Sequence, residues 1–269
     1  MEYKKISFGS FIGSFFVFTI VILLGVILMK NGVIGDNSAK NSSEKKAMKL
    51  PELPDVVFPK TIKMGSATQT AFPTDKKTPA NLVTADGVYP TNTPFAVIAE
   101  AHVKGFLQDF MERYFDKNDI LTSSGVSAES AATFSHGKKL FSYLYSDYTD
   151  EGGAHGNIVF SSETLDMNGK KYALADIFLP ETAYLDIVSE KAIVYFSKDP
   201  NINFDSKDAM FGKGLDPKPE NFATFFISGD KIIFQFQNYQ IGPYSEGTQR
   251  FEISVIDPEL KGIIKSELF

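Results

Sequence analysis

Cysteine is absent from the 269 residues, and so is tryptophan. The lack of cysteine excludes disulfides, thiolate metal sites, cysteine nucleophiles and a lipid attached to cysteine. Histidine occurs only at His102, His136 and His155. HExxH, phosphate-loop, dinucleotide-binding and G-x-S-x-G motifs are missing as well. The sequence therefore carries no motif of a common metal site or enzyme, and we expect no cofactor.

Positive charge is scarce in the larger part of the chain. Residues 91–269 hold 16 Lys and Arg against 26 Asp and Glu, a net charge of −10, whereas residues 1–90 hold 11 against 7. Since phosphate binding needs clustered cations, we expect no nucleic-acid partner. An acidic domain would attract a basic partner, although an ordinary solvated surface has the same composition.

One long apolar run is present near the start of the chain. Residues 6–29 contain no charged side chain, and about 20 apolar residues cross a bilayer as a helix. The run is long for a signal peptide, which has about 7 to 15 apolar residues, and no A-x-A cleavage site follows it. We predict a single-pass anchor in the cell membrane at residues 6–29, after a cytoplasmic tail of residues 1–5, with the large domain outside the cytoplasm. Cleavage of the anchor is left open.

The rest of the chain divides into a linker and one domain. Residues 30–94 are first polar and then rich in proline, which predicts a linker and a stalk that lays an edge strand on the domain. Residues 95–269 contain two amphipathic helical segments among several strand patterns. Because helices and strands do not alternate regularly, we predict an α+β fold with a mainly antiparallel sheet and two packed helices.

Local signals predict where the helices begin. Thr93 and Pro94 match the N-cap and first position of a helix, along which apolar residues recur every three or four positions. His102 lies on this apolar stripe, so we expect it at the boundary of the core. A second helix is expected at residues 181–196, and Asp257-Pro258 predicts a short C-terminal helix.

Alternating residues and turn motifs predict the strands. Residues 139–148 alternate, and the next strand is expected at residues 157–166. Asn168-Gly169 predicts a type I′ turn that continues this hairpin into residues 172–178. A second hairpin is expected within residues 221–236, across Gly229-Asp230. On the first strand, the residues expected on one face are Phe141, Tyr143 and Tyr145.

The segment from Asp147 to Asn157, DYTDEGGAHGN, is the most unusual part of the sequence. Its glycines allow a partner to approach the backbone closely. His155 beside several carboxylates fits a hydrogen-bond anchor, a proton donor or a metal ligand. The alternative is a tight connection in which His155 and Asn157 bond to nearby backbone. Since no thiolate or second histidine completes a transition-metal site, we expect no metal.

Two stretches about 80 residues apart resemble a bacterial domain of unknown function. They are Tyr148–Asn157 and Phe236–Gly247, the latter reading FQNYQIGPYSEG. This RsiV-like domain occurs in the exported half of the anti-sigma-V factor, a lysozyme receptor, and beside some peptidoglycan deacetylases. The resemblance covers residues 95–268 and implies an exported module that binds a basic, lysozyme-like protein or peptidoglycan. Only about five residues precede the predicted anchor, so we expect no anti-sigma activity.

These observations predict a membrane-anchored, non-catalytic binding module of the cell envelope. The alternative is an envelope hydrolase that acts on glycan or peptide, with Asp147, Asp150, Glu151 and His155 as acid–base residues. A structural spacer is the third interpretation. The sequence does not determine the oligomeric state. The candidate ligand-binding residues are Gly152, Gly153, His155, Asn157, Tyr239, Tyr244 and Glu246.

Overall fold

The computed structural model describes residues 58–71, 83–115, 126–200, 202, 204–205, 208 and 210–269. All of them lie in the compact unit Pro51–Phe269. The predicted tail at residues 1–5, the predicted anchor at residues 6–29 and the first part of the linker lie outside the described residues. Within the described ranges, no helix is both long and apolar enough to cross a membrane.

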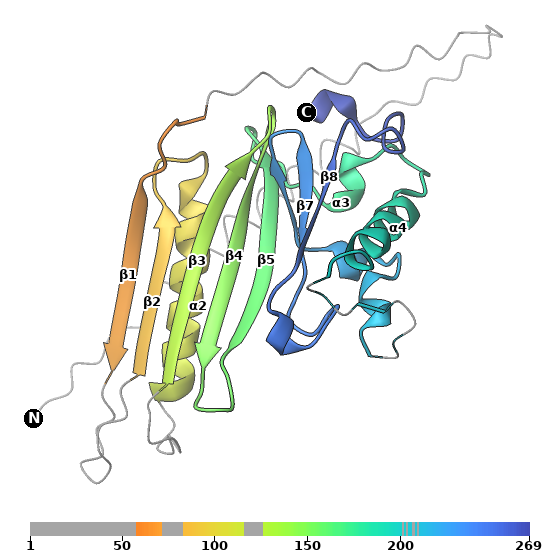
Figure 1. Cartoon of the computed structure of the whole chain (residues 1–269). Coiled ribbons are helices and arrows are strands. Elements are labelled where there is room, and N and C mark those ends of the chain that lie inside the picture. The colour runs from red at the N-terminus through yellow and green to blue at the C-terminus, as the bar shows by residue number, and fades with distance from the viewer. Residues whose placement is uncertain are drawn as a thin grey trace, which may run out of the picture. The chain divides into compact units, whose positions relative to one another are not determined.

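The larger of two sheets has five strands in the order β1-β2-β3-β4-β5 (Figure 1). The strands are β1 (Met64–Ala71), β2 (Val83–Pro90), β3 (Val126–His136), β4 (Leu140–Asp150) and β5 (Asn157–Asp166). Neighbouring strands are antiparallel except β2 and β3, which are parallel and are connected through helix α2 (Ala96–Phe115). The α+β class and the mainly antiparallel sheet are confirmed. Strands β1 and β2 lie within residues 30–94, the predicted linker and stalk.

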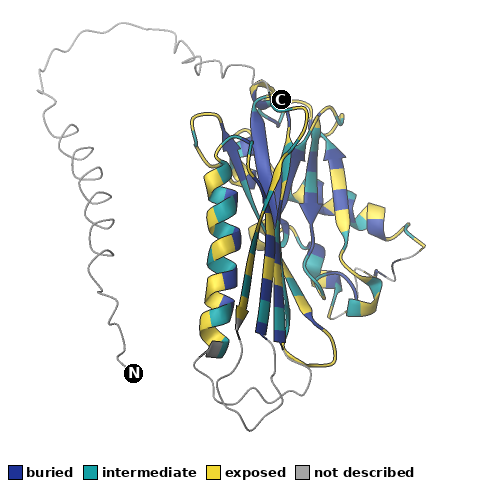
Figure 2. Cartoon of the chain, turned by 90° about the vertical axis from the view of Figure 1, so that its left-hand side faces the viewer, coloured by how far each residue is buried: buried dark blue, intermediate teal, exposed yellow. Residues whose placement is uncertain are grey.

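Helix α2 covers one face of the larger sheet (Figure 2). Its Val103, Leu107 and Phe110 are fully buried against that face. Gly87 on β2 permits the close approach, because a Cβ there would lie 3.0 Å from Leu107 Cδ1. The predicted alternation on β4 is confirmed. The aromatic side chains that it turns toward α2 are Phe141, Tyr143 and Tyr145.

The predicted start of the first helix is wrong by a few residues. Phe95 has a positive φ of 54°, and the helix begins at Ala96. Thr93 is buried and its hydroxyl lies 2.6 Å from the hydroxyl of Tyr143, which donates to the Pro94 carbonyl at 2.6 Å. A tertiary hydrogen bond therefore uses the side chain that could have capped the helix.

The strand predicted at residues 172–178 is also wrong. After the turn only an isolated bridge joins Lys171 to Leu165, and Leu174–Ile177 forms the short helix α3. Gly169 has a φ of 78°, but Asn168 does not have the positive φ that a type I′ turn requires. Instead, Asp166 Oδ1 accepts the N–H groups of Asn168 and Lys170 at 2.8 and 3.1 Å. The side chain of Asp166 therefore determines the turn.

The smaller sheet has the order β6-β7-β8 and belongs to a second core. Its antiparallel strands are β6 (Phe225–Ser228), β7 (Lys231–Gln235) and β8 (Arg250–Ser254). The predicted hairpin at Gly229-Asp230 is confirmed, with Gly229 at a φ of 59°. Helix α4 (Tyr184–Phe196) packs against this sheet. The 3₁₀ helices are η1 (Gly212–Leu215), η2 (Pro219–Phe222), η3 (Tyr244–Glu246) and η4 (Ser266–Leu268).

The helix predicted from Asp257 is replaced by successive turns that lead to η4. Gly262 has a φ of 98°, which an α-helix does not accommodate. The Phe178–Ile264 bridge then ties this segment to the chain after α3. The C-terminal segment thus packs as a sequence of turns on the second core.

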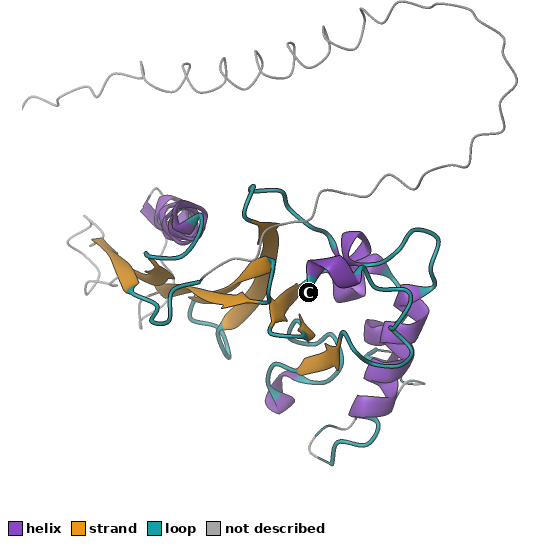
Figure 3. Ribbon diagram, turned by 90° about the horizontal axis from the view of Figure 1, so that it is seen from above, coloured by secondary structure: helices purple, strands orange, loops and turns teal. Residues whose placement is uncertain are grey.

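The two sheets pack against each other on the face of the larger sheet that α2 leaves open (Figure 3). Leu144, Phe160 and Phe226 are buried between them. Ser142 Oγ on β4 accepts the Ile227 N–H at 2.9 Å, which attaches β6 to the larger sheet. Beyond β6 this face is hollowed, with a volume of about 490 Å³.

The buried tyrosine Tyr145 predicts a loss of stability at alkaline pH. Burial raises the pKa of its phenol, and the Glu163 carboxylate 3.5 Å away raises it further. In the unfolded chain the phenol of Tyr145 ionises near pH 10, whereas in the folded chain it remains protonated at that pH. The contribution of Tyr145 to the free energy of unfolding is therefore fully present below pH 10 and falls above it. We expect Tyr145 to contribute a decrease of ~1.4 kcal/mol per pH unit there. Urea unfolding between about pH 9 and 11 should show a shallower decrease for Tyr145→Phe; identical pH dependence would contradict the prediction.

Candidate functional site

The loop between β4 and β5 holds His155 at the surface. Asp150 Oδ1 accepts the N–H of Gly152 at 2.9 Å, and Gly152 has a φ of 78°. Any Cβ on Gly156 would collide with the phenol ring of Tyr148. Glycine at this position therefore lets the loop lie directly on Tyr148, with His155 exposed beside it.

The imidazole of His155 is held by three contacts. Its Nδ1 lies 2.9 Å from the Gly156 carbonyl oxygen, its Nε2 lies 3.1 Å from the Tyr239 hydroxyl, and its ring stacks on Tyr244 at 3.9 Å between centroids. A carbonyl only accepts, so Nδ1 carries a proton and donates it to the Gly156 carbonyl. The ring is thus oriented from both sides.

The second half of the site is the turn between β7 and β8. Tyr239 has a positive φ of 63°, and Tyr244 begins η3. The side chain of Gln240 donates to the carbonyls of Gly214 and Asn221 at 3.0 and 2.9 Å. Gly242 leaves room for Glu246, since a Cβ there would lie 2.5 Å from Glu246 Oε2. The turn is therefore attached to η1 and η2 of the second core.

The structure brings together residues from both stretches of the resemblance. We call His155, Tyr239 and Tyr244 the aromatic cluster. Tyr239 is 50% exposed, and its ring lies 5.9 Å from that of Tyr244. The remaining candidate residues lie on the two connections that form the cluster. Gly152, Gly153 and Asn157 lie exposed on the first connection, and Glu246 lies half-buried on the second.

The hollow on the larger sheet lies next to the cluster and was not predicted. Strand register places Asp86 beside Glu129, Glu129 beside Tyr148, and Tyr148 beside Ile158. These side chains line the hollow. Burial raises the pKa of Tyr148, which also packs on the loop at Gly156. Only the pairing of four strands shows that these residues are neighbours, so no local sequence signal could have identified them.

The carboxylates of the hydrolase interpretation do not converge on His155. Asp147 faces α2, where its carboxylate accepts a hydrogen bond from the Ser130 hydroxyl at 2.6 Å and lies 2.9 Å from His102 Nε2. The aspartate stands between the serine and the histidine, whereas a catalytic triad needs the histidine in the middle. Asp150 bonds to the loop backbone. Glu151 forms a hydrogen bond with Tyr114, and this bond together with burial raises the pKa of the Tyr114 phenol to about 12.

His102 lies at the boundary of the core, as the helical stripe indicates. Its imidazole is partly exposed and stacks on Tyr145 at 3.7 Å between ring centroids. Among the described residues, no group of three or more histidine and carboxylate side chains is placed to hold a metal ion.

The fold and the site define an α+β domain with a surface aromatic cluster, and solved structures share this fold. A DUF3298 family protein from Bacteroides fragilis NCTC 9343 superimposes with a TM-score of 0.54 at 18% identity, over 77% of this chain and 94% of that one. One from Pseudomonas aeruginosa PAO1 has a TM-score of 0.53 at 18% identity, over 78% and 97%. Residues 175–255 match the family described as "Protein of unknown function (DUF3298)". A DUF3298 domain is therefore present, and its matched region contains Tyr239 and Tyr244.

Part of the chain is also similar to a part of a curated protein. The chain is 30% identical over 133 residues to the peptidoglycan-N-acetylmuramic acid deacetylase PdaC of Bacillus subtilis (strain 168). The match covers 49% of this chain and 28% of PdaC, so the chain spans less than a third of that relative.

Proposed function

We propose that this chain is a membrane-anchored, non-catalytic binding module of the cell envelope, of the RsiV-like type. The observation that carries the proposal is the convergence of His155, Tyr239 and Tyr244 at the surface, from connections 84 residues apart in the sequence. Residues 6–29 tether the module, and the domain lies outside the cytoplasm. Similarity to a peptidoglycan deacetylase supports an envelope role.

The ligand class that the geometry supports best is a cationic, lysozyme-like protein. Lys and Arg side chains pair with carboxylates and lie over aromatic faces. Asp86 and Glu129 supply the carboxylates in the hollow, and Tyr148 connects the hollow to the aromatic cluster. The acidic surplus of residues 91–269 would steer such a partner toward the domain.

Peptidoglycan is the second candidate ligand, and the similarity to PdaC is the observation that favours it. Exposed aromatic rings can pack on sugar rings, and carboxylates can accept their hydroxyl groups. Binding to peptidoglycan would depend weakly on salt, whereas binding to a cationic protein would fall as salt rises.

Tyr239→Ala and Tyr244→Ala are expected to weaken ligand binding by about tenfold or more, because central aromatic side chains dominate interface energies. The test immobilises the detergent-solubilised full chain and titrates a basic lysozyme at about 50 and 200 mM salt, with pelleting on purified peptidoglycan in parallel. Val97→Ala is the control, because Val97 is 68% exposed and lies on α2, outside the cluster and the hollow. If neither ligand binds, or if both cluster variants bind like the control, the proposal is wrong.

A further inference from the structure

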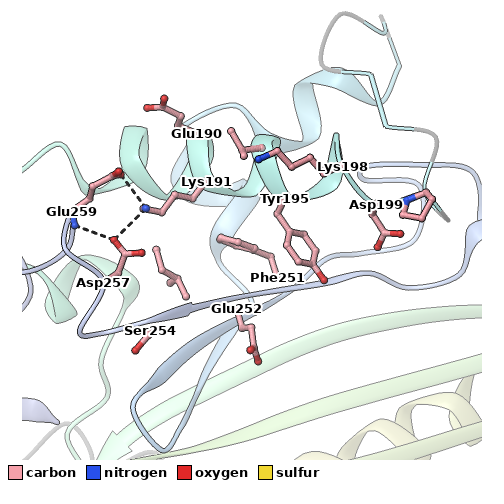
Figure 4. Close-up of a pocket in the computed structure, with 13 residues that line it drawn as sticks. Glu190, Lys191, Tyr195, Lys198, Asp199, Phe251, Glu252, Ser254, Asp257 and Glu259 are labelled. Carbon is pink, nitrogen blue, oxygen red and sulfur yellow. Dashed lines mark hydrogen bonds and ion pairs between the residues drawn. The ribbon is translucent and has the colours of Figure 1, made fainter.

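A second surface lies between α4 and β8 (Figure 4). It is a groove of about 750 Å³ that shares no lining residue with the cluster or with the hollow. Helix α4 forms one wall and β8 the other. The residues that line it are Glu190, Lys191, Val194, Tyr195, Lys198, Asp199, Pro200, Phe251, Glu252, Ile253, Ser254, Asp257 and Glu259.

The strand wall of the groove is a sheet edge. Strand β8 is the last strand of its sheet and pairs with β7 alone in the part of the chain that the structure describes. Phe236 donates to the Gln249 carbonyl at 3.0 Å, and Val255 donates to the Asp230 carbonyl at 2.8 Å. In an antiparallel pair, every second residue exchanges backbone hydrogen bonds with the neighbouring strand. The odd-numbered residues of β8 therefore bond to β7, and the even-numbered residues turn their N–H and C=O groups away from β7. Glu252 therefore directs its N–H and C=O toward the groove side of the strand.

The side chains give the groove two different faces. Phe251 and Ile253 are buried toward α4, where Val194 and Tyr195 remain 45% and 47% exposed. Tyr195 packs on Phe251 with 5.6 Å between ring centroids, which leaves an apolar floor beside the edge. Glu252 points to the opposite face of the sheet, where it pairs with Lys231.

The charges of the groove favour a cationic occupant. Five lining side chains are carboxylates and two are lysines. Lys191 is already held by Asp257 at 3.2 Å and by Glu259 at 3.1 Å (Figure 4). A bound segment with positive charge would therefore meet an excess of carboxylates.

We propose that this groove binds an extended cationic segment of a partner protein, which adds to β8 as an antiparallel strand. Strand addition supplies backbone hydrogen bonds, and alternate side chains supply specificity. The ligand residue opposite Glu252 shares its face of the sheet, so it is Lys or Arg. Its two neighbours point toward α4 and are apolar, packing on Val194 and Tyr195. The ligand is thus an apolar–basic–apolar alternation.

The direction of the backbone hydrogen bonds gives a sharp test with labelled peptides that alternate valine and lysine. When the peptide pairs antiparallel to β8 with one lysine opposite Glu252, all its lysines turn their backbone N–H groups toward β8. The valines turn theirs away from β8. Methylating the lysine backbone nitrogens should weaken binding to the detergent-solubilised full chain by about tenfold, or ~1.4 kcal/mol. Methylating the valine nitrogens should leave binding unchanged. Equal affinities for the two methylated peptides would overturn the proposal.

Substitutions at Glu252 provide the matching test on the protein. Glu252→Pro should abolish peptide binding and keep the fold, because an edge proline whose N–H faces outward removes no ladder hydrogen bond. Glu252→Lys should weaken binding, whereas Glu112→Lys, an exposed charge reversal on α2, should not. Sedimentation of the full chain tests a second copy as the occupant. If the parent chain binds no peptide but forms a dimer that Glu252→Pro dissociates, the occupant of the groove is a second copy of the chain and the proposed ligand is wrong.

Discussion

Gly214→Ala is expected to destabilise the domain by about 3 kcal/mol and to disturb the aromatic cluster at the same time. A Cβ on Gly214 would lie 2.7 Å from the backbone carbonyl carbon of Gln240 and closer still to its oxygen. Neither atom belongs to a flexible side chain, so η1 or the segment that carries Tyr239 has to move. Urea unfolding should show the loss as a lower midpoint at an unchanged slope.

Gly153→Ala is the matched control for this experiment. The nearest atom to a Cβ on Gly153 is the backbone oxygen of His155 at 3.8 Å, which is an ordinary contact. We expect a change within ~0.5 kcal/mol, typical of surface substitutions. If Gly214→Ala unfolds at the same midpoint as this control, the packing of η1 on Gln240 does not hold the cluster in place.

Phe236→Ala should cost about 4 kcal/mol, the largest effect that we predict. Phe236 is fully buried, and its ring lies 5.5 Å from that of Phe196 and 6.1 Å from that of Phe222. Removal of the ring leaves a cavity among aromatic neighbours that cannot collapse without moving α4 or η2. Because Phe236 is the last buried residue before the turn with Tyr239, the loss should also loosen the cluster.

The unfolding midpoint of Ile256→Ala serves as the reference for Phe236→Ala. Ile256 is 73% exposed, so its truncation should change stability by ~0.5 kcal/mol or less. Near-ultraviolet circular dichroism of the folded variants would report whether the tyrosines of the cluster change their environment. A midpoint for Phe236→Ala close to that of Ile256→Ala would contradict the assignment of Phe236 to the core.

Local sequence patterns correctly predicted the elements that depend only on interactions between neighbouring residues. The strand predicted at residues 157–166 is β5, and the alternation on β4 places its aromatic residues on the α2 face. The Gly229-Asp230 hairpin is also as predicted, because glycine alone meets the positive φ there without strain. Period and turn chemistry determine such elements, and both are properties of a few neighbouring residues.

The errors arose where another side chain, distant in sequence or only a few residues away, competed with the local signal. Thr93 bonds to Tyr143, 50 residues away, in place of capping a helix. Asp166 accepts the turn N–H groups, and α3 then buries Leu174 and Ile177 where a second hairpin strand was predicted. The parallel pairing of β2 with β3 likewise depends on the crossover through α2.

The sequence by itself determined the fold class and the two stretches that meet at the site, because periodicity, turn residues and the motifs of the resemblance are properties of short contiguous segments. Only the tertiary structure decided that His155 stacks on Tyr244, that Asp86 lies beside Glu129 and that β8 ends a sheet facing α4. These three facts depend on strand register and on packing between segments that are distant in sequence. A one-residue change of register would turn each side chain to the opposite face, and no local pattern specifies it across several strands.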